Sequence, residues 1–269
     1  MTASADPIAA LVDLPGVSDA ALKARDDVDA LLWERSLREK GPALARESMW
    51  RGAQSNAALD GVEFAYEAWR SGDAFEASPI GAAAAGVLRM HRDLPSLVST
   101  WHTAPVQAVA RMHALVAKDV PGVDPDSLGR PRMDDAADDP LRVGVAPASA
   151  VEAAARLQAL ARQVNASSAP GIVRAAVVHG ELLALRPFAY GSGLVARAAV
   201  RLVLADSGVD PDQLSAPEVG VQMQGRPAYV RAIRGYLGGT PEGVADWCVF
   251  VAASVGLGAQ QARAALASL

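Results

Sequence analysis

Apolar residues recur at helical spacing along almost the whole chain. Ser18 can cap a helix whose apolar residues lie near one face, because they recur three or four positions apart. Those residues are Ala24, Val28, Leu31 and Leu32. Residues 43–59 predict a second helix, which ends at the glycine of the pair 60–61. Glycine, aspartate and proline separate the further helices expected near 63–70, 79–90 and 94–118.

Residues 119–147 break this pattern, since they are rich in proline, glycine and aspartate. We expect a loop there, and the pattern leaves open a short β-hairpin around Leu141 to Val145. A capping box at Ser149 and Glu152 then begins a helix that runs to about Val164. Further helices are predicted near 172–185, near 194–205 and from Pro241 onward. The sequence therefore predicts an all-α fold.

Composition narrows the class of protein. A chain of 269 residues, 51% hydrophobic and 20% charged, suits a soluble globular domain. Its net charge of −5 argues against nucleic acid as a partner. The N-terminal residues lack the pattern of a signal peptide, and polar residues and glycines interrupt the apolar stretch 249–266, which argues against a membrane partner. The single cysteine, Cys248, excludes an intrachain disulfide and predicts a reducing, cytoplasmic location.

The most specific stretch is a turn between two apolar helices, residues 186–197, which reads Arg-Pro-Phe-Ala-Tyr-Gly-Ser-Gly-Leu-Val-Ala-Arg. The proline ends the first helix, and a Gly-x-Gly turn precedes the second. Free N–H groups and the dipole at a helix N-terminus attract anions. Arg197 follows Gly193 by one helical turn and so points along the same side. The pattern predicts an anion site, suited to phosphate, made by Arg186, Gly191, Ser192, Gly193 and Arg197.

This stretch resembles the signature motif of the Fic/Doc family, whose members transfer a nucleotide, usually AMP from ATP, to a protein hydroxyl. The family motif reads His-Pro-Phe-x-Asp/Glu-Gly-Asn-Gly-Arg-x-x-Arg. Five positions match it in register: Pro187, Phe188, Gly191, Gly193 and Arg197. A looser match continues in order over about residues 50–255. It includes a segment at 126–147 that resembles the family's flap, a hairpin that holds the target peptide.

The resemblance implies the Fido fold, a helical bundle with the flap as a short β-hairpin. It divides the chain into an N-terminal helical extension at 1–48, a Fic-like domain at 49–255 and a C-terminal helix end at 256–269. It also implies ATP or another nucleotide as the ligand and a protein partner at the flap.

Four motif positions depart from the family pattern in ways that remove its chemistry. Arg186 stands where the family has its general base, and a guanidinium cannot take a proton at neutral pH. Tyr190 replaces the acid that holds Mg²⁺, and a phenol is a poor ligand for that ion. Ser192 and Leu194 replace two groups that contact phosphate. Losing base and metal together should cost well over about 10⁴ in rate, so we expect no catalytic residue, no metal and no AMP transfer.

Residues 56–61 resemble the inhibitory motif of many Fic proteins, Ser/Thr-x-x-x-Glu-Gly/Asn. In the family its glutamate pairs with the last motif arginine and obstructs the γ-phosphate. The resemblance implies an inhibitory lock between Asp60 and Arg197, although the shorter aspartate leaves its reach open. A plain helix C-terminal turn at Asp60 is the alternative.

Other polar residues carry weaker signals. We expect no catalytic role for the four histidines, His91, His102, His113 and His179, and we expect the aspartates at 134, 135, 138 and 139 to lie in a solvated loop. Three functions stay open. The first is a degenerate Fic domain, or pseudoenzyme, that binds a nucleotide or phosphate or acts as a regulatory interaction module. The second is an active nucleotidyl- or phosphoryl-transferase with a non-standard site, and the third is a structural or interaction protein without a ligand.

Overall fold

The computed structural model describes residues 6–269, and this range contains helices, turns and loops but no strand. The predicted all-α fold is therefore confirmed. The α-helices are α1 (Val17–Leu32), α2 (Leu37–Leu59), α3 (Tyr66–Ser71), α4 (Pro79–Thr103), α5 (Pro105–Ala117), α6 (Ala150–Ala166), α7 (Gly171–Leu185), α8 (Ser192–Asp206), α9 (Pro217–Gln224), α10 (Arg226–Leu237) and α11 (Pro241–Ser268). Three short 3₁₀ turns are η1 (Ala9–Asp13), η2 (Asp73–Phe75) and η3 (Pro125–Ser127).

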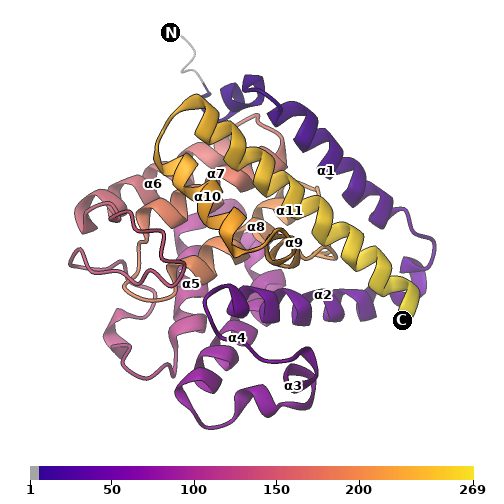
Figure 1. The fold of residues 1–269 in the computed structure, drawn as a ribbon, viewed down its shortest axis with the longest axis horizontal. Helices are drawn as coiled ribbons and strands as arrows, with labels where there is room; N and C mark the ends of the chain where they lie inside the picture. The colour runs from indigo at the N-terminus through magenta and orange to yellow at the C-terminus, as the bar shows by residue number, and fades with distance from the viewer. Residues whose placement is uncertain (1–5) are drawn as a thin grey trace.

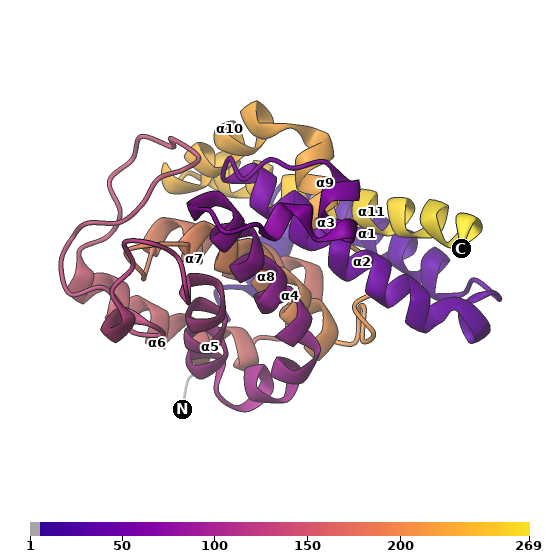
Figure 2. The same ribbon diagram turned by 90° about the horizontal axis from the view of Figure 1, so that it is seen from below.

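Helix α8 lies at the centre of the bundle (Figures 1 and 2). It packs against α7, α4, α5, α9 and α2. Every residue from Ser192 to Ala205 is buried. The loop before α8 therefore leads into the N-terminus of a buried helix.

The long helix α11 lies against α1 along one side of the molecule (Figure 1). By length and composition α11 could cross a membrane, yet 67% of its most apolar stretch is buried inside this fold. One hydrophobic core extends from Ile8 to Leu266. The boundaries expected at 48/49 and 255/256 fall inside helices α2 and α11.

Helix α4 differs from the expectation of two helices with a break near residues 90–94. It continues through Pro95 to Thr103, and the break comes at Ala104, just before Pro105 begins α5. A proline in a helix interior removes one backbone hydrogen bond and usually bends or ends the helix. Here burial of neighbouring side chains outweighs that cost; they are Leu94, Leu97 and Trp101.

The flap, residues 126–147, contains no strand, so the short hairpin left open by the sequence does not form. Its far end is a turn organised by Asp139. The two carboxylate oxygens of Asp139 accept the backbone N–H groups of Val143 and Gly144, both at 3.0 Å. Those N–H groups are therefore unavailable for a strand ladder.

Candidate functional site

The loop between α7 and α8 is shaped by two left-handed residues. Arg186 caps α7 at φ 41°, and its N–H donates to the Leu182 carbonyl at 3.0 Å. Gly191 precedes α8 at φ 73°, a conformation that glycine adopts without the penalty of a β-carbon. No side chain within residues 6–269 caps the first turn of α8. Its N–H groups thus form an uncapped donor set inside the protein.

Arg197 lies on the next turn of α8 and forms an ion pair with Asp60 at the end of α2. The distance from Arg197 Nη2 to Asp60 Oδ1 is 2.7 Å, and the two side chains are 1% and 8% exposed. Burial raises the pKa of the Asp60 carboxyl, and the Arg197 guanidinium opposes that rise. Burial lowers the pKa of Arg197, but the charge of Asp60 together with Tyr229 and the hydrogen bonds to both residues outweighs this effect, so the net shift is upward. Arg197 is therefore a charged group held inside the fold.

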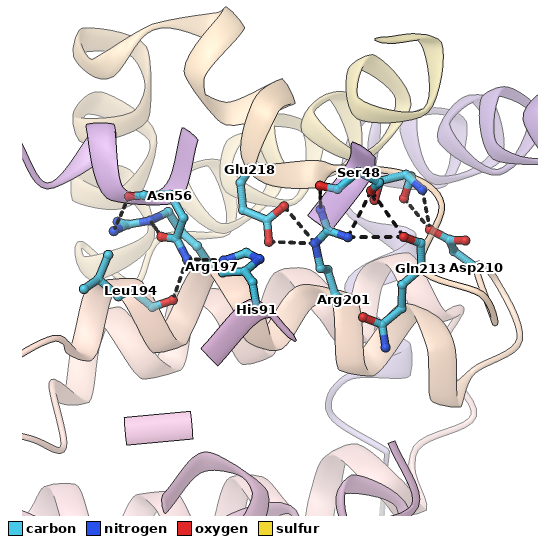
Figure 3. Close-up of polar contacts among 10 residues, drawn as sticks. Ser48, Asn56, His91, Leu194, Arg197, Arg201, Asp210, Gln213 and Glu218 are labelled. Carbon is cyan, nitrogen blue, oxygen red and sulfur yellow. Dashed lines mark hydrogen bonds and ion pairs between the residues drawn. The ribbon is translucent and has the colours of Figure 1, made fainter. Parts of the chain in front are cut away.

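Asn56 completes the surroundings of Arg197 (Figure 3). Its side-chain oxygen accepts Arg197 Nε at 2.6 Å, while its Nδ2 donates to the Leu194 carbonyl at 3.0 Å and lies 3.0 Å from His91 Nε2. Arg197 Nη1 is buried and, in the described part of the chain, has no hydrogen-bond partner. A β-carbon added at Gly193 would lie 3.2 Å from that Nη1 atom. The free donor of Arg197 is thus beside the first turn of α8.

A second buried ion pair lies one turn further along α8 (Figure 3). Arg201 Nε is 3.0 Å from Glu218 Oε1, and the side chains are 3% and 0% exposed. Arg201 also donates to the carbonyls of Ser48 and Gln213. Arg201 thus connects α8 to α9 through Glu218 and to α2 through Ser48.

The flap places Asp138 at the opposite side of the loop. Asp138 Oδ2 accepts the Gly191 N–H at 2.8 Å, and the Asp138 N–H donates to the Ala189 carbonyl at 2.9 Å. Its Oδ1 atom is buried with no partner among the described residues. Burial raises the pKa of Asp138 to about 6, and the Gly191 N–H partly offsets this effect. A carboxylate from the flap therefore contacts the entrance to α8.

Arg132 and Arg186 hold the flap against the loop. The Arg132 N–H donates to the Pro187 carbonyl at 2.9 Å, and its guanidinium donates to the Arg186 carbonyl at 2.8 Å and to the Ala148 carbonyl. Arg186, only 8% exposed, donates to the Val145 carbonyl and lies 3.8 Å from Asp139. The Arg186 side chain is thus directed to the flap.

Ser192 and Phe188 stabilise the loop from within. Ser192 Oγ is buried and contacts both the N–H and the carbonyl of Phe188, at 3.0 and 3.1 Å. The ring of Phe188 stacks on His113, with centroids 3.9 Å apart and planes at 3°. His113 Nδ1 accepts the Gly129 N–H at 2.9 Å. The hydroxyl of Ser192 is therefore occupied by the loop itself.

Residues 103–204 match the model of the Fic/DOC family. This stretch contains α5, the flap, α6, α7, the loop and most of α8. The central part of this chain is therefore similar to the Fic/DOC family. A comparison with curated proteins found no match.

Solved structures show that the Fic fold extends over nearly the whole chain. A Fic family protein from Desulfovibrio desulfuricans G20 superposes with a TM-score of 0.74 at 15% identity, over 93% of this chain and 75% of that one. A fragment of Fic-1 from C. elegans gives 0.69 at 19% identity, over 94% and 73%. A Fic domain containing signaling protein from Bacteroides thetaiotaomicron VPI-5482 gives 0.61 at 15% identity, over 93% and 97%.

Tyr190 does not suit magnesium in this Fic-fold protein. Burial raises the pKa of Tyr190, at the position of the motif acid, to about 12, so the phenol stays neutral. Within residues 6–269 no three side chains of His, Cys, Asp or Glu come together as a metal site. Mg²⁺ prefers carboxylate and phosphate oxygens, which a neutral phenol does not replace.

The histidines of the Fic domain are engaged elsewhere. Burial lowers the pKa of both His91 and His113 to about 4 and holds that of His179 well below its usual range. His179 Nε2 lies 2.7 Å from the Tyr229 hydroxyl. His102 is exposed, and its Nδ1 lies 2.8 Å from Asp206. None of the four lies at the position of the motif base, which Arg186 fills.

Sequence reasoning missed two acidic contacts in the flap. The interpretation of the aspartates as a solvated run is wrong for Asp138 and Asp139, which contact the motif loop and the turn of the flap. It holds for Asp134 and Asp135, which are exposed. The contacts with the motif loop join residues about 50 positions apart, and spacing in the sequence does not predict such contacts.

Proposed function

We propose that this protein is a Fic domain without nucleotidyl transfer that binds a nucleotide or another phosphate at the first turn of α8. The observation that carries the proposal is the uncapped, buried first turn beside the unpartnered Nη1 of Arg197 in the described structure. Backbone N–H groups and an arginine are the donors that phosphate oxygens accept. Gly193 leaves room beside the ion pair, because a β-carbon there would lie 3.2 Å from Arg197 Nη1 and 3.5 Å from Asp60 Oδ2.

The missing transfer follows from the groups at the motif positions. A nucleophilic attack on phosphate needs a base that can take the proton of the attacking hydroxyl. The guanidinium of Arg186 remains charged at neutral pH and is bound to the flap. Tyr190 brings no charge to hold a metal. We infer that a bound nucleotide stays intact.

The Asp60–Arg197 pair supports an inhibitory role at the same site. A carboxylate 2.7 Å from the guanidinium already neutralises the cation that a phosphate would use. A phosphate must therefore compete with Asp60 for Arg197. We propose that this pair weakens the binding of the phosphate without closing the site.

Binding is tested by calorimetry and thermal melts with ATP and with inorganic tripolyphosphate. A ligand at 100 times its Kd should stabilise the protein by about 2.7 kcal/mol. Gly193→Ala should weaken both ligands, because the new methyl group lies 3.2 Å from Arg197 Nη1. Gly41→Ala is the matched control, since a β-carbon there meets nothing within 4 Å. Equal binding by the two variants, or no binding by the unaltered protein at millimolar ligand, rejects the site.

Absence of transfer is tested with α-labelled ATP and Mg²⁺. The unaltered protein should label neither itself nor added protein. A variant with the family groups restored should gain labelling; it carries Arg186→His, Tyr190→Asp, Ser192→Asn, Leu194→Arg and Asp60→Gly. Labelling by the unaltered protein would favour an active transferase with a non-standard site instead.

We also propose a cytoplasmic location and a protein contact at the flap. Support for the location comes from the single thiol, Cys248, which is buried and whose pKa burial raises to about 12. Met133, on the flap, is 95% exposed. The inner side of the flap is bonded to the motif loop, so a partner that needs that side must displace these bonds.

A further inference from the structure

Asp138 contacts the loop in the way an anionic ligand would. It accepts the N–H of Gly191, the residue that precedes the uncapped turn of α8. A carboxylate near a helix N-terminus is stabilised by the free N–H groups and by the helix dipole. The second oxygen, Oδ1, is buried without a partner within the described residues. The Asp138 carboxylate therefore already lies beside the proposed phosphate site.

Asp138 lies among both positive and negative charges. Burial and the charges of Asp138 and Asp60 raise the pKa of Tyr190, and Asp60 repels the Asp138 carboxylate. Arg186 and Arg197 attract it. An incoming phosphate faces the same two cations and both carboxylates. Removing the Asp138 carboxylate thus removes repulsion and frees the Gly191 N–H donor together.

We propose that Asp138 is a tethered competitor for the phosphate site, so that a phosphate binds well only after the flap withdraws this carboxylate. The proposal rests on the phosphate site proposed above. It differs from the Asp60 pair because Asp138 belongs to the flap, a segment without regular secondary structure at this point, whereas Asp60 caps the end of helix α2, whose last turns are largely buried.

The flap has contacts that survive the loss of the Asp138 side chain. Backbone bonds at Arg132 and at Asp138 itself, both 2.9 Å, join it to the carbonyls of Pro187 and Ala189. The Arg132 guanidinium adds four further carbonyl contacts in this region, to Arg186, Asp134, Ala148 and Leu185. Asp138→Ala is therefore expected to fold with a looser flap.

The test compares Asp138→Ala with the unaltered protein and with Asp134→Ala. Asp134 is an exposed flap aspartate whose side chain accepts only the nearby Ala136 N–H, so its loss changes the net charge equally. Affinity for tripolyphosphate and for ATP is measured by calorimetry, and flap opening by hydrogen exchange over residues 131–148. We expect Asp138→Ala to bind tripolyphosphate roughly tenfold more tightly than both other proteins, with faster exchange in the flap.

The outcomes separate this proposal from the one on which it rests. If all three proteins bind tripolyphosphate equally, Asp138 does not compete, although the phosphate site stands. If none binds at millimolar concentration, the phosphate site fails and the competition with it. A gain for ATP without a gain for tripolyphosphate also overturns the proposal, because the nucleoside would then be the recognised part. Should Asp138→Ala not fold, Asp138→Asn keeps the volume and an acceptor, and its loss of charge should still tighten binding severalfold.

Discussion

Replacing Asp60 by alanine leaves a charged arginine inside the protein without its carboxylate. The side chain of Arg197 is 1% exposed and 2.7 Å from that carboxylate. Breaking a buried ion pair by removing one partner typically costs about 3–5 kcal/mol. Arg197 keeps its bond to the Asn56 oxygen at 2.6 Å, so we expect the lower end, about 3 kcal/mol. Total stabilities are about 5–15 kcal/mol, so this loss is large.

Urea denaturation followed by circular dichroism measures this change in the free energy of unfolding. For a chain of this size the melting temperature should fall by roughly 6–12 °C, from about 2–4 °C per kcal/mol. Asp93→Ala is the control, because it breaks an exposed pair with Arg111 at 3.3 Å. Exposed pairs contribute about 0–1 kcal/mol. The double variant Asp60→Leu with Arg197→Met should recover most of the loss, since no charge is then left unpaired.

A phosphate titration of the same variant connects stability to the proposed site. The unpaired Arg197 should attract phosphate, so the anion should stabilise Asp60→Ala more than the unaltered protein. The reasoning is refuted if Asp60→Ala loses no more stability than Asp93→Ala. In that case Arg197 would be hydrated, and its burial would not require a carboxylate.

Three further predictions concern other parts of the site. Glu218→Gln should cost about 3 kcal/mol in urea denaturation, because it leaves Arg201 as a buried cation; a loss below 1 kcal/mol contradicts this. Asp138→Asn should flatten the pH dependence of unfolding. The pKa of Asp138 in the folded protein, about 6, exceeds the ordinary aspartate pKa of 3.8, so its contribution to stability is full below pH 3.8 and is lost as the pH rises through 6. Parallel pH profiles for the two proteins would contradict that shift, which burial, Gly191, Asp60, Arg186 and Arg197 together set. Arg132→Ala should speed hydrogen exchange across the flap, because four carbonyls lose a donor; unchanged exchange means the backbone bonds suffice.

The sequence predicted the helices and the motif loop better than the contacts between them. The local signal at Ser149 correctly predicted a helix start, since its Oγ accepts the Glu152 N–H at 3.3 Å. The return bond of the capping box does not form, because the Glu152 side chain pairs with Arg156 instead. Pro95 misled the prediction, because packing of α4 against the core outweighs a local propensity. The Asp60–Arg197 contact was implied only through family resemblance, since 137 positions separate the two residues. Asp138 and the Arg201–Glu218 pair had no local signal, because they depend on how loops and helices meet in space.

The charges around the motif loop balance one another without a ligand. Arg197 is paired with Asp60, and Arg186 with Asp139, while Asp138 takes the N–H of Gly191. A loop that binds phosphate tightly would leave its cations and its N–H groups free for the phosphate oxygens. Here a phosphate must replace at least one internal carboxylate, so part of its binding energy offsets that exchange. Any event that moves the flap or shifts α2 would therefore change affinity for phosphate, even if it never touched the loop.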